Sequence, residues 1–173
     1  WQPSKACEPY MDDDKRVVVK KLAENVVSRI HDQPANVTEL KKQEKKQNAP
    51  LPYNLSALQI DASKRFSMSA KQALDTCQSL YEKHKLITYP RSDCRFLPTE
   101  HFGQAAKIIE QLTHSTEPFG EWAKNANSQL KSKAWNDAKV SAHHAIIPTQ
   151  KSAQGVSLSR DEKNIYSLVV RQY

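Results

Sequence analysis

Residues 86–98 read LITYPRSDCRFLP, a stretch in which a proline separates a tyrosine from an arginine. Pro90 has no backbone N–H and disfavours helical backbone at the residue before it, so no helix is expected to run through this segment. The apolar pair before Thr88 therefore indicates a short extended piece. Alternate residues of an extended segment share a side, which predicts that Tyr89 and Arg91 project together.

The side chains of this stretch suit chemistry at a phosphate group. A phenol with a pKa near about 10 is a weak nucleophile at neutral pH, and a neighbouring cation favours its phenolate form. The Arg91 guanidinium matches two phosphate oxygens and would stabilise charge that develops at phosphorus. Residue types alone leave a plainer interpretation open, in which Tyr89 packs and Arg91 is a surface charge.

Helical patterns lie on both sides of this stretch. Upstream, apolar residues of 55–66 share one stripe, and Ser69 is expected to cap a second helix over residues 70–81. The pair resembles a helix-turn-helix. Downstream, Thr99 is expected to cap a helix that runs to Leu112.

Two further helices and two strands are expected towards the ends of the chain. Ser159 and Glu162 form a capping box that predicts a last helix. Residues 22–30 have helical spacing, whereas residues 17–19 and 35–40 have the composition or alternation of strands. A basic stretch and two prolines follow, which indicates a domain boundary there.

Composition narrows the classes of function. A formal net charge of +7 favours polyanionic partners. Three cysteines without paired spacing predict neither a disulfide framework nor a zinc site, and three glycines provide no phosphate-binding loop. The three acids at positions 12–14 are expected to form a solvated turn rather than a metal site.

The absence of a long apolar run predicts a soluble, cytoplasmic protein with no membrane segment. Because the chain opens on Trp1 rather than Met and its last helical pattern stops at Tyr173, both ends are expected to be cuts in a longer protein.

Four ordered stretches resemble those of the type IA DNA topoisomerases, and most closely the topoisomerase III subgroup. They are PYNLSALQIDASKRF (52–66), QSLYE (78–82), LITYPRSDCRFLP (86–98) and AHHAIIPT (142–149). The resemblance implies an α+β, mostly helical fold. It assigns residues 1–47 to part of a strand-rich arch that carries a hinge, residues 48–152 to a winged-helix-like (CAP-like) domain with the active-site tyrosine, and residues 153–173 to the start of a return helix.

The same resemblance implies roles for individual residues. Tyr89 falls on the nucleophile that forms a covalent bond to the 5' phosphate of the broken strand, and Arg91 on the cation that stabilises the transition state. His143 falls on a histidine that contacts DNA near the scissile phosphate. No carboxylate or thiol completes a metal site with His143 and His144.

Five more positions are implied as contacts of a bound single strand. Ser56, Gln59, Gln78 and Tyr81 are expected beside the strand, where hydroxyl and amide groups contact phosphates and a ring stacks on a base. Asp93 is expected to support Arg91 or position the DNA. A helix-surface or core role stays open for the first four, and a turn-capping role for Asp93.

The resemblance predicts an enzyme that cleaves and rejoins one DNA strand through a 5'-phosphotyrosine, which allows strand passage, relaxation of negative supercoils and decatenation. Its implied partner is single-stranded DNA and its implied cofactor is Mg(II), bound outside this chain, so the isolated chain is expected to be an inactive monomer. Two alternatives remain, a non-catalytic winged-helix module that only binds DNA and an interaction fragment without DNA contact.

Overall fold

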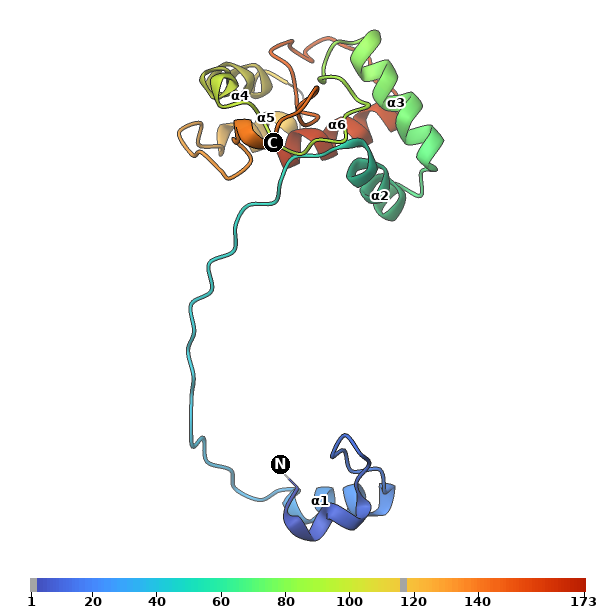
Figure 1. Ribbon diagram of the computed structural model, residues 1–173, viewed down its shortest axis with the longest axis vertical. Coiled ribbons are helices and arrows are strands. Elements are labelled where there is room, and N and C mark those ends of the chain that lie inside the picture. Colours follow the sequence, from blue (N-terminus) through green and yellow to red (C-terminus); the bar gives the residue numbers. More distant parts are fainter. Residues whose placement is uncertain (1–2, 116–117) are drawn as a thin grey trace. The chain divides into compact units, whose positions relative to one another are not determined.

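Contacts between residues divide the chain into two units, Trp1–Lys45 and Lys46–Tyr173. The computed structural model describes residues 3–115 and 118–173, so Trp1, expected above to be a cut end, lies outside the described residues. The described residues are mostly helical, as predicted (Figure 1). Their extended segments meet only in isolated β-bridges.

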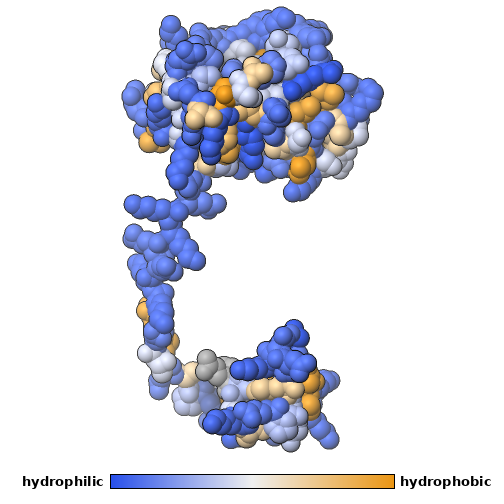
Figure 2. All heavy atoms as spheres, viewed as in Figure 1, coloured by the Kyte–Doolittle hydropathy of each residue, from blue (hydrophilic) through white to orange (hydrophobic). Residues whose placement is uncertain are grey.

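The first unit contains a short 3-10 helix, η1 (Lys5–Tyr10), and one α-helix, α1 (Lys20–Ile30). The helix predicted from the spacing of residues 22–30 is confirmed. Its apolar side chains find little cover, because α1 has no buried residue and Cys7 is the buried hydrophobic residue of η1. Figure 2 shows apolar residues at the surface of this unit.

The strand predicted at residues 17–19 is wrong. Val17 forms a single antiparallel bridge with Met11, after which Val19 already precedes the first turn of α1. The cause is a tight turn between Met11 and Val17. In this turn the Asp12 carboxylate accepts hydrogen bonds from the backbone N–H and the guanidinium of Arg16, both at 2.8 Å. The acidic turn predicted at residues 12–14 is therefore confirmed, and it leaves no length for a strand.

The edge strand predicted at residues 35–40 is also wrong. This segment has no regular secondary structure, and both Val37 and Leu40 are 86% exposed. Loose alternation of apolar residues does not make a strand where no neighbouring strand accepts its hydrogen bonds.

The second unit begins with two helices, α2 (Leu55–Phe66) and α3 (Ala70–Glu82). Asn54 caps α2 by accepting the Ala57 N–H at 2.9 Å. Ser67 ends α2 in the left-handed conformation, at φ 56°. The predicted cap of α3 is confirmed and extends to a full capping box, in which the Ser69 N–H also donates to Gln72 Oε1.

The rest of the second unit is helical with extended connections. Its elements are η2 (Thr99–Gln104), α4 (Ala105–Thr113), α5 (Phe119–Lys124), η3 (Asp137–Lys139) and α6 (Arg160–Gln172). Helix α6 packs against α2 and α3, and α4 packs against α5 (Figure 1). The core has fully buried Leu58, Leu80 and Tyr166 at its centre, which ties α2, α3 and α6 together.

The predicted capping box of the last helix is confirmed, since Ser159 and Glu162 exchange hydrogen bonds at the start of α6. The cap predicted at Thr99 is wrong. Thr99 opens the 3-10 helix η2, and its N–H and hydroxyl both donate to Asp137, the N–H at 2.8 Å. The Thr99 side chain, which the sequence pattern predicted as a helix cap, instead forms its hydrogen bond with a residue 38 positions away.

Residues 145–148 join two other segments of the second unit. Ile146 pairs with Tyr53, just before α2, and Pro148 pairs with Ile87, just after α3. Both bridges are antiparallel. The segment before Tyr89 is therefore held against the AHHAIIPT stretch. No helix among the described residues combines the length and the apolar composition that a membrane crossing needs.

Candidate active site

Tyr89 lies at the surface on a rigidly held backbone. Its neighbours Ile87 and Pro90 are almost fully buried, whereas Tyr89 itself is 37% exposed. The Thr88 N–H donates to the Ile147 carbonyl at 2.9 Å, and the Thr88 hydroxyl donates to Ala145 O while accepting the Ile147 N–H. A reactive phenol on this segment would be presented to solvent with little backbone freedom.

Two rings flank the Tyr89 ring. The His143 ring lies 4.4 Å away between centroids, with the planes tilted by 38°. The Tyr81 ring meets it edge-on at 5.8 Å and 83°. These residues come from the AHHAIIPT stretch and from α3, so two of the predicted DNA contacts converge on the predicted nucleophile.

Arg91 lies in a turn, not in an extended segment. Pro90 and Arg91 form this turn, which removes the alternation that predicted a common side for Tyr89 and Arg91. The Arg91 side chain is tied to α3 instead, because its Nε donates to Gln78 Oε1 at 3.3 Å. Gln78 in turn donates from Nε2 to Glu82 Oε1 at 2.6 Å.

The three other predicted DNA contacts lie on α2 and just after Arg91, and two of them take part in hydrogen bonds. Ser56 is exposed on α2, and Gln59 Nε2 donates to the Ala70 carbonyl at 2.9 Å across the junction of α2 and α3. Asp93 has an exposed side chain, and its carbonyl accepts from Asn54 Nδ2 at 2.9 Å. Gln59 thus has a structural contact that its predicted DNA role did not include.

Sequence reasoning missed three residues of this region. Thr88 links the two motif stretches, Glu82 holds Gln78, and the Lys85 ammonium lies 5.6 Å from the centre of the Tyr81 ring. The signal for Glu82 was present, because residues four apart on a helix are neighbours. The contacts of Thr88 span 57 and 59 residues and left no local signal.

His144 has a different setting from His143. It is half-buried, its Nδ1 lies 2.8 Å from the Ala145 carbonyl, and its ring packs edge-on against His101. Burial lowers the pKa of His144, and the nearby histidines add to this effect. Its neutral form is therefore favoured, in contrast with a histidine that binds phosphate through its charge.

A buried polar network lies between α3 and α6. Glu162 accepts hydrogen bonds from the Ser79 hydroxyl at 2.7 Å and the Ser159 N–H at 2.7 Å, and His84 Nε2 lies 3.0 Å from it. Burial acts to raise the pKa of Glu162, but these hydrogen bonds and His84 outweigh it and lower the pKa to about 2. Glu162 is ionised at neutral pH and anchors the helix before the Tyr89 segment to α6.

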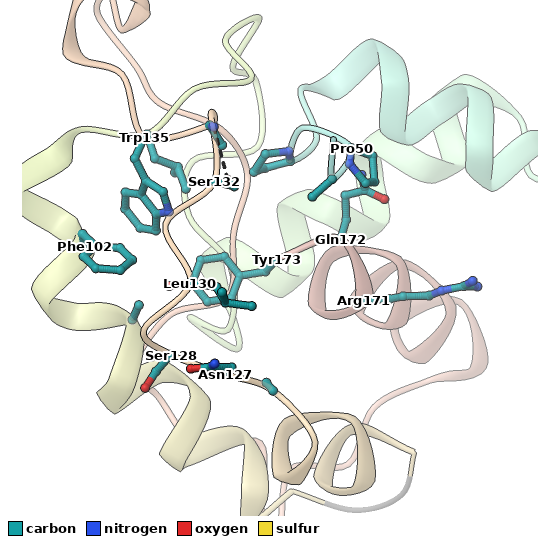
Figure 3. Close-up of a pocket in the computed structure, with 16 residues that line it drawn as sticks. Pro50, Phe102, Asn127, Ser128, Leu130, Ser132, Trp135, Arg171, Gln172 and Tyr173 are labelled. Atoms are coloured by element: carbon teal, nitrogen blue, oxygen red, sulfur yellow. Dashed lines mark hydrogen bonds between the residues drawn. The ribbon is translucent and has the colours of Figure 1, made fainter. Parts of the chain in front are cut away.

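The second unit also contains a cavity of about 310 Å³ that is separate from these residues (Figure 3). Trp135, Phe102 and Tyr173 contribute aromatic walls, and Asn127 and Ser128 lie near its edge. None of the predicted site residues lines it. Tyr89, Arg91 and His143 are exposed, so the candidate active site lies at the surface of the second unit.

No group of three or more histidine, cysteine, aspartate or glutamate side chains is placed to hold a metal ion in the described ranges 3–115 and 118–173. The resemblance implies an Mg(II) bound outside this chain, and no chemical step is assigned to a metal here.

Comparison with known proteins identifies the family. Residues 4–173 match the DNA topoisomerase family, so the chain belongs to it. The chain is 56% identical over 173 residues to DNA topoisomerase 3 of Vibrio cholerae and 57% identical to that of Haemophilus influenzae. It is 38% identical over 180 residues to the DNA topoisomerase 3 of Bacillus subtilis.

Each of these matches covers the whole chain but only 27%, 26% and 23% of the respective relative. The chain thus spans about a quarter of the length of the relatives that it matches. The predicted membership of the type IA topoisomerases, topoisomerase III subgroup, is confirmed.

Proposed function

We propose that this chain is the strand-cleaving part of a type IA DNA topoisomerase and that Tyr89 is its nucleophile. The observation that carries the proposal is the convergence of Tyr81, His143 and Tyr89 on one exposed surface, with Arg91 held nearby by α3. These residues come from three of the stretches that resemble the family. If Tyr89 were only a packing residue at the surface, nothing would require residues from these three stretches to meet around it.

The proposed reaction exchanges one phosphate ester for another. The Tyr89 oxygen forms a bond to phosphorus, the bond from phosphorus to the 3' oxygen breaks, and the proton lost by the phenol is balanced by protonation of the leaving 3' oxygen to a hydroxyl. The strand then carries a 5'-phosphotyrosine. The 3' hydroxyl reverses the step, so no nucleotide is consumed and the strand is rejoined after another strand has passed.

Arg91 and His143 have complementary roles in this proposal. The Arg91 guanidinium donates to the non-bridging oxygens of the scissile phosphate and stabilises the charge that develops there. His143 contacts the strand beside Tyr89. Tyr81 and Gln78 complete the strand-binding surface, with Ser56, Gln59 and Asp93 contacting more distant parts of the DNA.

The proposal extends to the setting of the enzyme. Residues 48–152 act as the winged-helix-like domain, residues 153–173 begin the return helix, and residues 1–47 act as part of a hinged arch. The substrate is single-stranded DNA, the enzyme works as a monomer in the cytoplasm, and Mg(II) binds to a part of the enzyme beyond these residues. Strand passage then relaxes negative supercoils or unlinks joined molecules.

A non-catalytic DNA-binding module is the second candidate, supported by the packed helix pair α2 and α3. Such a module would bind through this pair and would not depend on the phenol of Tyr89.

Tyr89→Phe in the full-length enzyme separates the two candidates. We expect no detectable cleavage of a labelled single strand, with DNA affinity within about twofold of the parent because one hydroxyl is removed and no charge changes. Tyr81→Phe is the matched control, since its ring touches Tyr89 but its hydroxyl is not the nucleophile. Undiminished cleavage by the Tyr89→Phe protein would reject the enzymatic proposal.

A further inference from the structure

A short line of hydrogen bonds reaches Arg91 from helix α3. Arg91 Nε donates to Gln78 Oε1 at 3.3 Å, and Gln78 Nε2 donates to Glu82 Oε1 at 2.6 Å. Gln78 and Glu82 are four residues apart on α3, so they share one face of the helix. The amide of Gln78 therefore connects Glu82 with Arg91.

The groups at the two ends determine the orientation of this amide. An ionised carboxylate only accepts hydrogen bonds, and a guanidinium only donates them. The amide nitrogen of Gln78 must therefore face Glu82, and its oxygen must face Arg91. Without an acceptor at position 82, the amide could turn its two donors towards Arg91, where no hydrogen bond can form.

The same arrangement keeps the charge of Arg91 available. Arg91 is exposed, and it forms no ion pair with any residue in the described part of the chain. A neutral amide, rather than the Glu82 carboxylate, occupies its Nε. The two terminal nitrogens of the guanidinium remain for a bidentate contact with phosphate oxygens.

We propose that Glu82 is a positioning residue for strand cleavage. It holds the Gln78 amide so that the amide oxygen fixes Arg91 by Nε and leaves the outer edge of the guanidinium for the scissile phosphate. This inference rests on the proposed function of Tyr89. It assigns a role to a carboxylate that touches neither the nucleophile nor, in this scheme, the DNA.

Glu82→Ala in the full-length enzyme tests the proposal through two quantities, the rate of strand cleavage and the affinity for DNA. The single-turnover rate of strand cleavage is expected to fall about 10- to 100-fold, because a small misplacement of a reacting group slows a reaction by up to about 100-fold. DNA affinity is expected to stay equal or increase slightly, because a negative charge leaves a DNA-binding surface. An unchanged or faster cleavage rate would overturn the positioning role.

Two substitutions distinguish positioning from support of the fold. Glu82→Gln still offers an oxygen to Gln78, so it is expected to recover most of the rate, whereas Glu82→Lys offers only donors and should cleave most slowly. Glu82→Ala should melt within a few degrees of the parent. Equal losses in the Glu82→Ala and Glu82→Gln proteins, together with a large fall in melting temperature, would show a structural role instead.

A double-mutant cycle and two controls complete the design. Gln78→Met removes the link between Glu82 and Arg91, so adding Glu82→Ala to it is expected to slow cleavage no further than Gln78→Met alone. Glu110→Ala changes an exposed glutamate on α4 and should cleave at the parent rate. If Tyr89→Phe abolishes cleavage but Glu82→Ala does not slow it, the positioning role alone fails; if Tyr89→Phe still cleaves, the proposed function fails.

Discussion

The two units of this chain differ in what their helices pack against. Helix α1 of the first unit leaves Val27 and Ile30 more than half exposed, and none of its residues is buried. Helix α6 of the second unit fully buries Ile165 and Tyr166. Both helices follow from the same spacing of apolar residues, so the spacing shows which residues share a face but not whether that face has a partner.

The chemistry follows the same division. The candidate site is built on the second unit, where buried residues hold the backbone on both sides of Tyr89. Because these buried residues hold the backbone, the side chains of Tyr89 and Arg91 do not need to be buried to keep the fold stable. The first unit offers exposed apolar residues and a basic stretch, without a comparable set of buried residues among those that the structure describes.

Truncation of one apolar helix residue in each unit should give the largest contrast. Leu58→Ala, at a fully buried position in α2, is expected to lower the free energy of unfolding by roughly 2–5 kcal/mol because it leaves a cavity. Val27→Ala, at an exposed position in α1, should change it by less than about 0.5 kcal/mol. Urea unfolding followed by circular dichroism measures both. Similar losses in the two variants would break the comparison.

The Glu162 network should give the next largest effect. Glu162→Gln removes the ionised partner of His84, and a loss of roughly 2–3 kcal/mol is expected at pH 7. Because the pKa of Glu162 is lowered from 4.5 to about 2, its contribution is complete above about pH 4.5 and is lost as the pH falls towards 2.

The pH dependence supplies the control for this second prediction. The Glu162→Gln protein should lose less stability than the parent between about pH 4.5 and about pH 2, whereas Glu110→Gln on the exposed face of α4 should follow the parent curve. Parallel curves for the parent and Glu162→Gln would show that the carboxylate is not stabilised in the folded state.

Two buried tyrosines of the second unit provide the smallest test. The Tyr166 hydroxyl is buried without a hydrogen-bond partner among the described residues, whereas the Tyr53 hydroxyl donates to Asp61 at 2.6 Å. Tyr166→Phe is expected to stabilise the unit by roughly 1 kcal/mol, and Tyr53→Phe to destabilise it by a similar amount. Thermal unfolding would reveal the sign of each change, and a destabilised Tyr166→Phe protein would point to a partner for this hydroxyl.

Features with local causes were predictable from the sequence. The helices at α2 and α3, the cap at Ser69 and the capping box at Ser159 depend on residues within a few positions of one another. Tyr81 and Tyr89, whose rings are in contact, also lie within a short stretch of sequence. Only the resemblance to a family, however, assigned functional roles to these two residues.

Features that depend on distant partners were not predictable in this way. Thr99 forms a hydrogen bond with Asp137 and does not act as a helix cap. The β-bridges of residues 145–148 with two separate segments fix the position of the backbone beside Tyr89. The turn at Pro90 and Arg91 interrupts the alternation that the sequence pattern assumed between Tyr89 and Arg91. The Arg91 side chain is held by a hydrogen bond to Gln78 on α3, a contact that the sequence pattern does not show.

The central claim, that the Tyr89 oxygen bonds to the DNA backbone, can be measured directly. The full-length enzyme would be trapped on a single-stranded oligonucleotide with denaturant, digested with trypsin and nuclease, and analysed by mass spectrometry for the peptide that carries a nucleotide. We expect the adduct on residues 86–91, at Tyr89. An adduct on Tyr81 or on any other side chain would contradict the account.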